Sequence, residues 1–258
     1  MSKLLTIAAL LLVHVSLAQH PNAHAHNDYE HAKPLIDALK HGFTSIEADV
    51  HLVDKDLLVA HNRPTASSRS LEALYLQPIA RLIKEHGALY PGYDGDFYLM
   101  LDIKTEAETT CLAIEALLNK YLEIIDTPLD DGDDDHPVKI FLSGNRPISQ
   151  LLQNTRPLVA LDGRPVDLAK NIPASLMPVV SQNFGRYNPF TLTGKVNSDK
   201  ELKLRQYIDA VHEQGKKVRF WAHSDEPETW DYLLSLGVDL INSDKLEELD
   251  IFLTERGL

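Results

Sequence analysis

The chain has 258 residues, and its 44% hydrophobic and 24% charged content is ordinary for a globular protein. Its formal net charge of −13 argues against nucleic acids and anionic membranes as partners, because both attract basic rather than acidic surfaces. The single cysteine, Cys111, excludes an internal disulfide, so stability must come from a hydrophobic core. Cys111 lies in an apolar, helix-like segment, where a buried thiol is expected.

The first residues predict a secretory signal peptide covering residues 1–18. Lys3 precedes an apolar run over residues 4–15, and Ser16-Leu17-Ala18 supplies the small residues that precede a cleavage site. The apolar run is shorter than the roughly 20 residues that span a bilayer, so no transmembrane segment is expected. We therefore expect an exported protein, periplasmic or secreted, whose mature chain begins at Gln19.

Short apolar runs alternate with longer amphipathic runs through the rest of the chain. The short runs predict strands at 22–26, 44–50, 97–103, 138–142, 158–161, 178–181, 217–222 and 238–242, with a hairpin strand at 57–60. The amphipathic runs predict helices at 29–41, 70–86, 106–125, 148–153, 166–171, 198–214, 226–236 and 246–255. Gly42, Gly87, Gly215 and Gly237 each follow a predicted helix, where glycine commonly ends one.

This alternation predicts an α/β protein with a (β/α)8 TIM barrel fold, formed as a single domain over residues 19–258. A doubly wound open sheet is the alternative, but no glycine-rich phosphate-binding loop marks its switch point. No Ser/Gly-rich linker divides the chain. The acidic run at 130–135 lacks the spacing of a calcium-binding loop, and we expect a solvated loop there.

Two carboxylates, Glu47 and Asp49, interrupt an apolar predicted strand. Residues two apart on a strand face the same side, so these acids need a cation or hydrogen bonds to offset their repulsion. Asp102 and Lys104 repeat this spacing at the end of the strand at 97–103. Three carboxylates without clustered cysteines suit one hard divalent cation, Mg2+ or Ca2+, rather than zinc. Lys104 beside them is suited to bind a phosphate oxygen.

Histidines flank these acids in the sequence, and a barrel brings the carboxyl ends of its strands to one site. His26 and His61 titrate near neutral pH and are the candidate acid and base. Trp221 offers an apolar or cation–π wall for a headgroup such as choline. Asn27 and Asn242 are further candidates to contact the substrate. The remaining polar residues at predicted strand ends are Ser143, Asp162, Ser181, Asn183 and His223.

Several motifs in a fixed order carry a resemblance to a known family. They are Ala25-His26-Asn27, Ile46-Glu47-Ala48-Asp49-Val50, Val59-Ala60-His61-Asn62, Leu101-Asp102-Ile103-Lys104, Trp221 and Gly237-Val238-Asp239. Together they resemble the glycerophosphodiester phosphodiesterase family, which belongs with the phosphatidylinositol-specific phospholipase C-like barrels. The resemblance implies a TIM barrel that cleaves glycerophosphodiesters or phospholipid-like substrates, in some members through a cyclic phosphate. It also implies site roles: Glu47, Asp49 and Asp102 as ligands of one divalent metal, His26 and His61 as acid and base, and Lys104 as a phosphate-binding residue.

The chain also departs from that family's pattern. Asn27-Asp28 stand where Arg-Gly usually follows the first histidine, and Asn62 stands where Asp usually follows the second. Asp102, in place of a more frequent Glu, resembles the sphingomyelinase D branch. Two alternatives therefore stay open: a sphingomyelinase D-like or phospholipase D-like lyase, and a noncatalytic secreted binding protein on a degenerate barrel. Retention of the histidines and carboxylates favours an enzyme, a phosphoric diester hydrolase with a small-molecule or lipid phosphodiester as substrate.

Overall fold

A computed structural model describes residues 18–129, 136–190 and 196–258 of the chain. Apart from Ala18, the predicted signal peptide lies outside the described residues, and so does the acidic run at 130–135. The described residues begin next to the first barrel strand.

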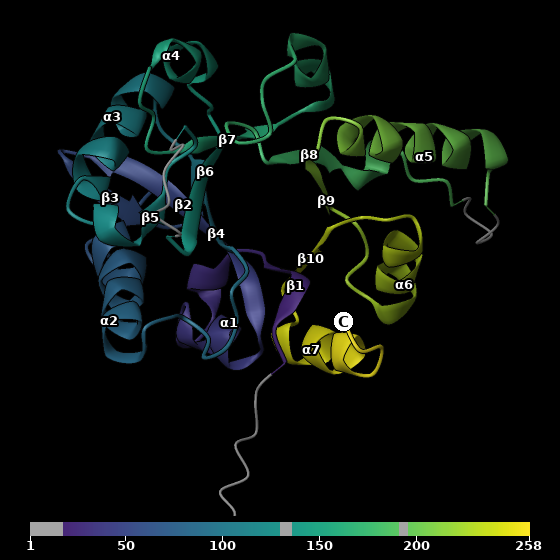
Figure 1. Ribbon diagram of the computed structural model, residues 1–258, viewed down its shortest axis with the longest axis horizontal. Helices are drawn as coiled ribbons and strands as arrows, with labels where there is room; N and C mark the ends of the chain where they lie inside the picture. The colour runs from purple at the N-terminus through teal and green to yellow at the C-terminus, as the bar shows by residue number, and fades with distance from the viewer. Residues whose placement is uncertain (1–17, 130–135, 191–195) are drawn as a thin grey trace, which may run out of the picture.

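Eight parallel strands form a closed barrel, and the predicted TIM barrel fold is confirmed. Strand β1 pairs in parallel with both β2 and β10, and this double pairing closes the ring shown in Figure 1. The barrel strands are β1 (His20–Ala25), β2 (Phe43–Val53), β4 (Phe97–Ile103), β6 (Val138–Gly144), β7 (Ala160–Gly163), β8 (Val179–Asn183), β9 (Lys217–Trp221) and β10 (Leu240–Ser243). The predicted hairpin is present as β3 (Asp56–Val59), antiparallel to the end of β2, and β5 (Ile125–Asp126) pairs with β6.

The helices lie outside the ring of strands (Figure 1). The α-helices are α1 (Ile36–Lys40), α2 (Gln77–His86), α3 (Ala107–Leu118), α4 (Ile148–Gln153), α5 (Ser198–His212), α6 (Pro227–Ser235) and α7 (Leu246–Thr254). Short 3-10 turns are η1 (Asp28–Glu30), η3 (Leu122–Ile124), η4 (Pro165–Lys170) and η5 (Phe184–Arg186), and η2 (Glu72–Leu76) is a π-helical turn. None of the helices among the described residues combines the length and the hydropathy that a membrane span requires.

The predicted helix at 29–41 is largely wrong. Only η1 and α1 form there, because Pro34 lacks an amide hydrogen and Leu35 adopts a left-handed φ of 65°. The buried Asp28 carboxylate fixes this turn by accepting hydrogen bonds from the Leu35 amide (2.6 Å) and the Tyr75 hydroxyl (2.9 Å). The chain thus leaves β1 through a tight turn rather than a long helix.

Other boundaries differ less. The helix predicted at 106–125 ends at Leu118, and Ile125, the last residue of the predicted range, begins the short strand β5. The helix predicted at 70–86 starts with the turn η2 before α2. The four predicted helix-ending glycines all adopt positive φ, between 68° and 87°. Cys111 is buried, as expected.

Two apolar clusters fill the fold. The larger one packs between the strands and the outer helices. The smaller one fills the lower interior of the barrel and comprises Tyr98, Met100, Phe141, Ala160, Val179 and Leu240, with Tyr98 and Phe141 in edge-to-face contact. Because these apolar side chains fill the barrel interior, the polar side chains gather at the carboxyl ends of the strands. This is the face where TIM barrels place their sites.

Candidate active site

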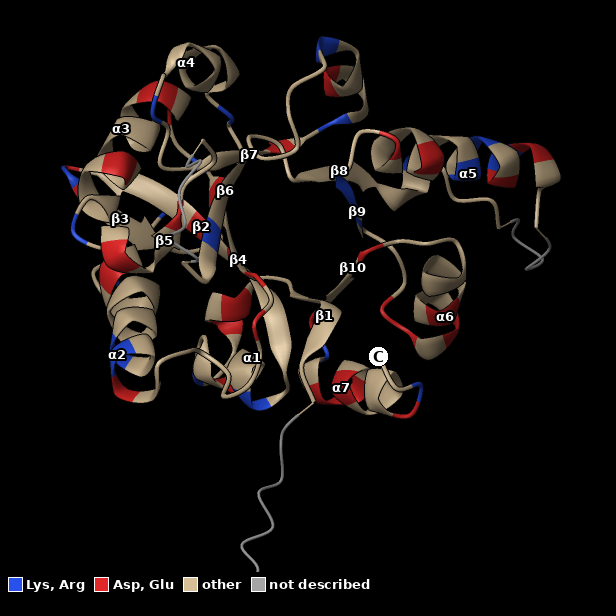
Figure 2. Ribbon diagram, viewed as in Figure 1, with Lys and Arg blue, Asp and Glu red and all other residues tan. Residues whose placement is uncertain are grey.

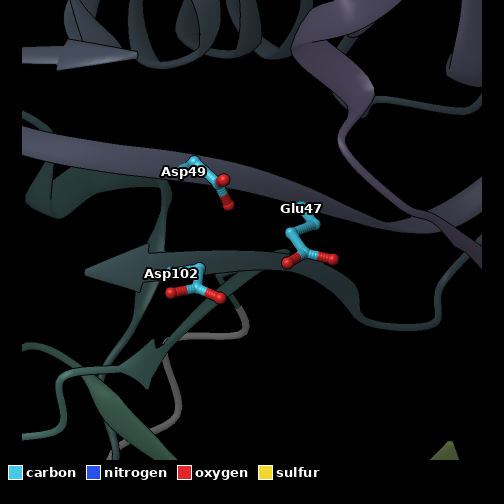
Figure 3. A group of neighbouring side chains, drawn as sticks. All are labelled: Glu47, Asp49 and Asp102. Atoms are coloured by element: carbon cyan, nitrogen blue, oxygen red, sulfur yellow. The ribbon is translucent and has the colours of Figure 1, made fainter. Parts of the chain in front are cut away.

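Three acidic side chains converge at the carboxyl ends of β2 and β4. Asp49 and Asp102 are directly opposite each other in the parallel pairing of these strands, and Glu47 lies two residues earlier on β2. One carboxylate oxygen from each residue lies within 4.8 Å of the other two. Figure 3 shows the three carboxylates gathered in the same region between the two strands. The alternation predicted from the sequence therefore places the three candidate metal ligands together.

The electrostatics of this cluster fit a bound cation. Oδ1 of Asp49 and Oδ1 of Asp102 are buried without a hydrogen-bond partner among the described residues, and such oxygens are costly to leave unpaired. Burial raises the pKa of Asp102 to about 6; Lys104 opposes this shift, while the charges of Glu47 and Asp49 add to it. Buried oxygen atoms that lack a donor are the ligands that Mg2+ or Ca2+ accepts.

Lys104 lies directly beside the cluster. Its Nζ is 3.1 Å from Oδ2 of Asp49 and 3.1 Å from Oδ2 of Asp102, and the side chain is half-buried. The ammonium thus occupies one side of the two aspartates and leaves their unpartnered Oδ1 atoms for another cation. It also lines the cavity above the site, where a phosphate oxygen can reach it.

Arg219 on β9 balances Glu47, and the sequence analysis did not identify it. Its Nη2 lies 2.9 Å from Oε2 of Glu47, and both side chains are buried. Burial alone would raise the pKa of Glu47, but the Arg219 charge and a hydrogen bond with His24 outweigh it and lower the pKa to about 2. Spacing could have identified Arg219, because it lies two residues before Trp221 and so faces the same side of its strand.

Asn242 supports this arginine. Its Oδ1 accepts hydrogen bonds from Nε (3.0 Å) and Nη2 (2.6 Å) of Arg219. Asn242 was predicted to contact the substrate, but it is buried and is not among the residues that line the active-site cavity. Its side chain therefore positions Arg219.

His26 and His61 both line the cavity beside the acidic cluster and share one arrangement. Nδ1 of His26 is 2.8 Å from Oδ1 of Asp244, and Nδ1 of His61 is 3.1 Å from Oδ2 of Asp49. A carboxylate only accepts hydrogen bonds, so each Nδ1 donates and each Nε2 is the nitrogen that can take up a proton. Nε2 of His26 lies 3.9 Å from Oε2 of Glu47. Burial lowers the pKa of His26, but the hydrogen bond to Asp244 and the charge of Glu47 raise it overall.

Tyr29 and Asp244 complete this arrangement and were not predicted. The Tyr29 hydroxyl lies 2.9 Å from Oδ2 of Asp49 and 2.9 Å from Oδ1 of Asn27. Asn27 adopts a left-handed φ of 46° in the turn after β1 and lines the cavity, as its predicted role requires. Asp244 directly follows β10, so only the barrel closure brings it to His26.

His24, two residues before His26, is a structural group. Its Nδ1 lies 2.7 Å from the Ser45 hydroxyl and its Nε2 3.5 Å from Oε2 of Glu47. Burial lowers the pKa of His24 to about 4, so the imidazole is neutral at pH 7. It therefore supports Glu47 without adding charge to the site.

The site opens into a cavity of about 240 Å³. Besides the residues above, Ser143, Arg164 and Trp221 line it. Arg164 was not predicted; its Nη1 lies 2.6 Å from Oδ2 of the buried Asp162, and its guanidinium carbon stacks 5.0 Å from the centre of the Trp221 ring. Asp162 also accepts hydrogen bonds from the hydroxyls of Ser143 and Ser181, so these predicted strand-end residues anchor the arginine.

Two other predicted strand-end residues have structural partners. The Asn183 side chain accepts a hydrogen bond from the Gly185 amide and caps η5. The imidazole of His223 lies 3.0 Å from the Ser224 carbonyl and packs edge-on against Phe184, and His223 does not line the active-site cavity.

Comparison with known proteins identifies the family. The model of the AIM6-like phosphodiesterase domain matches residues 18–158, more than half of the chain. The chain belongs to this AIM6-like family. Altered inheritance of mitochondria protein 6 from Eremothecium gossypii is 28% identical over 268 residues, which cover 89% of this chain and 68% of that protein. A homolog from Arthroderma benhamiae is 27% identical over 259 residues, covering 86% of this chain and 80% of the homolog.

Solved structures share the barrel of this AIM6-like protein. A glycerophosphodiester phosphodiesterase from Parabacteroides distasonis superposes with a TM-score of 0.58 at 13% identity, over 93% of this chain and all of that one. A phosphodiesterase from Oleispira antarctica, solved with its product sn-glycerol-3-phosphate, gives a TM-score of 0.55 at 14% identity, over 91% and 97% of the two chains. At such identities the likeness shows the fold alone.

Proposed function

We propose that this protein is a metal-dependent phosphodiesterase that cleaves glycerophosphodiesters or phospholipid-like diesters. One observation carries the proposal: two histidines, each with Nδ1 bonded to an aspartate, flank a cluster of three carboxylates with buried, unpartnered oxygens. A binding protein needs no such pair of proton carriers. The family assignment and the fold support the same reaction class.

Glu47, Asp49 and Asp102 are the residues that would hold one divalent cation, Mg2+ or Ca2+. When bound, the cation supplies positive charge that polarises the phosphoryl group and offsets the negative charge developing on its oxygens. Lys104, at the rim of the same cavity, binds a non-bridging phosphate oxygen as a point charge. Arg219 keeps Glu47 ionised, because its charge lowers the pKa of that carboxyl.

The two histidines carry the protons of the reaction through Nε2. One takes the proton from the attacking hydroxyl, either of water or of the substrate itself, as its oxygen forms a bond to phosphorus. The other gives a proton to the leaving alkoxide as the bond between phosphorus and that oxygen breaks. The first histidine therefore ends protonated and the second ends neutral. Asp244 and Asp49 hold the two imidazoles in orientation and stabilise their charged forms.

The nature of the attacking hydroxyl separates a hydrolase from a lyase. Attack by water gives a phosphate monoester, whereas attack by a neighbouring hydroxyl of the substrate gives a cyclic phosphate. Both routes use the same groups, so the lyase remains the second candidate for this site.

A product assay tests the proposed function. Purified protein is incubated with glycerophosphoglycerol, glycerophosphocholine and a lysophospholipid, with Mg2+, with Ca2+ or with a chelator, and products are followed by 31P NMR. We expect metal-dependent release of an alcohol, and the phosphorus signal distinguishes a monoester from a cyclic phosphate. No turnover of any diester with either metal would favour a noncatalytic binding protein.

We further propose that the protein is exported and that cleavage follows Ala18. The basic start, apolar run and Ser16-Leu17-Ala18 support this proposal. N-terminal sequencing of exported material should begin at Gln19, and material that begins at Met1 would contradict it.

A further inference from the structure

A second cavity, of about 750 Å³, adjoins the active-site cavity. The two cavities share Arg164 and Trp221 in their walls, so they lie side by side over the carboxyl ends of β7, β8 and β9. A substituent on a phosphodiester bound at the acidic cluster can extend into this second cavity. Its lining therefore bears on which substrates the enzyme accepts.

The second cavity is lined partly by the apolar side chains of Pro165, Val166 and Trp221, its charged and amide groups are hydrogen-bond donors, and it contains no carboxylate. Arg164 and Arg186 contribute guanidinium groups, and Gln182 and Asn183 contribute side-chain amides. The amide oxygens of Gln182 and Asn183 already accept backbone N–H bonds at 2.8 Å, so their NH2 groups are the polar atoms left for a ligand. A wall of donors selects a ligand that is rich in acceptors.

This basic wall stands out in an acidic protein with a net charge of −13. Figure 2 shows acidic residues spread over the outer helices α2, α3, α6 and α7. Arg164 is paired with Asp162, whereas the exposed Arg186 has no carboxylate within ion-pair distance among the described residues. Arg186 therefore supplies a positive charge that nothing in the described part of the chain neutralises.

Trp221 does not favour a cationic headgroup here. The guanidinium of Arg164 already lies over its ring, 5.0 Å from the ring centre. A quaternary ammonium such as choline in this cavity would meet the positive charges of Arg164 and Arg186. The positive charges beside Trp221 therefore favour an anionic rather than a cationic substituent in this cavity.

We propose that the second cavity binds a phosphate monoester on one alcohol substituent of the phosphodiester, so that the preferred substrate carries two phosphates. Arg186 and the amide NH2 groups of Gln182 and Asn183 hold the second phosphate, and Arg164 and Trp221 form the wall between the two groups. Arginine guanidinium groups match phosphate oxygens in geometry as well as charge. This inference rests on the proposed function, because the scissile phosphate must occupy the first cavity.

Binding to a slow variant tests the inference without relying on turnover. Calorimetric titration of His61→Ala with Mg2+ compares glycerophosphoglycerol, glycerophosphoglycerol phosphate and glycerophosphocholine. We expect the bisphosphorylated diester to bind about tenfold or more tightly than glycerophosphoglycerol, the scale of a charge-assisted contact. Adding Arg186→Gln should remove this preference. Adding Arg156→Gln should not, because Arg156 is an exposed arginine in the loop that enters β7 from the opposite end of the barrel.

The outcomes separate this inference from the proposed function. Wild-type turnover of glycerophosphoglycerol tests the proposed function alone. Equal affinity for glycerophosphoglycerol and its bisphosphorylated counterpart, tighter binding of the choline diester, no binding of any diester, or an unchanged preference after Arg186→Gln would each overturn the inference even if the wild type is active.

Discussion

Arg219 and Glu47 form a buried ion pair across the interior of the barrel, with Nη2 of the arginine 2.9 Å from Oε2 of the glutamate. They come from β9 and β2, which are 172 positions apart in the chain. The pair links two strands that are separated in the ring by β1 and β10. Removing one partner of a buried ion pair destabilises the folded protein by more than the intact pair stabilises it, because the remaining charge stays buried without a partner.

We therefore expect Arg219→Met to destabilise the metal-free protein by about 3 kcal/mol or more, measured by urea unfolding at pH 7. The control is Arg205→Met, which removes an exposed i,i+4 pair with Glu201 on α5 and should cost about 1 kcal/mol or less. Equal losses in the two variants would show that the buried pair does not contribute to the stability of the barrel.

Gly144 at the end of β6 shapes the candidate metal site. It pairs with Ile103 on β4 and has a φ of +65°, and a Cβ built on it would lie 2.0 Å from Oδ1 of Asp102. Gly144→Ala should therefore displace that carboxylate and weaken Mg2+ binding about tenfold or more in a calorimetric titration, as should Asp102→Asn. Gly87→Ala is the matched control, since Gly87 has a φ of +81° and open space around it. Metal affinity that falls equally in both glycine variants would implicate backbone strain rather than contact with Asp102.

Asp102 should make the metal-free protein less stable as the pH rises. Its folded pKa of about 6 lies above its ordinary value of 3.8, so the native state binds this proton more tightly than the unfolded state does. Stability is therefore lost as pH rises through this interval. This rise in pKa corresponds to a loss of stability of about 3 kcal/mol at most. In a variant that lacks the Asp102 carboxylate, loss of the ion pair with Lys104 offsets part of the stability regained.

We accordingly expect Asp102→Asn to be about 1–2 kcal/mol more stable than the wild type at pH 7 in the presence of chelator, and the difference to shrink at pH 5. Urea unfolding of both proteins at both pH values measures it. Asp28, whose pKa burial also raises to about 6, contributes equally to both proteins and cancels in the comparison. A variant that is less stable than the wild type at pH 7 would contradict this account of the site.

The two histidines should each be required for turnover. His26→Ala and His61→Ala are expected to lower kcat by about 10²-fold or more, the usual scale for a positioned acid or base. The double variant should lose far less than the product of the two factors, because the pair acts as a unit. His86→Ala, at the exposed end of α2, is the control and should retain full activity. Mg2+ affinity should change little in His26→Ala, and its loss would reassign that residue as a ligand.

Asp244 should act through His26. Because its carboxylate raises the pKa of that imidazole, Asp244→Asn should lower the His26 pKa in an NMR titration and lower kcat by about tenfold. Asp231→Asn removes an exposed carboxylate on α6 and should change neither quantity. A fall in kcat without a change in the His26 pKa would point to a different role for Asp244.

Local patterns in the sequence predicted much of the fold and part of the site. The alternation of Glu47 and Asp49 on an apolar strand, and its repetition by Asp102 and Lys104, required only the twofold period of a strand. The order of strands and helices and the glycines after the helices were equally local, and they predicted the barrel. The error at 29–41 arose because the hydrophobic period outweighed Pro34 in the prediction.

The missing parts of the site depend on contacts between strands that are distant in sequence. The importance of Arg219 comes from its ion pair with Glu47, which lies on another strand of the barrel. The importance of Gly144 comes from its pairing with Ile103 on the neighbouring strand. Asn242 illustrates the reverse case, since a polar residue at a strand end pointed to a ligand but serves another side chain. The sequence carries these residues without showing which partners they meet.

The bond between His26 and Asp244 has a consequence for how the protein is made. His26 follows the first strand and Asp244 the last, so ribosomal synthesis releases the aspartate only after nearly all of the chain has been made. The stretch matched by the family model already contains both histidines, the three carboxylates and Lys104, yet it lacks Arg219 and Asp244. A growing or prematurely ended chain therefore carries most of the reactive groups without the geometry to use them. The bond that orients His26 therefore forms only after the ring has closed.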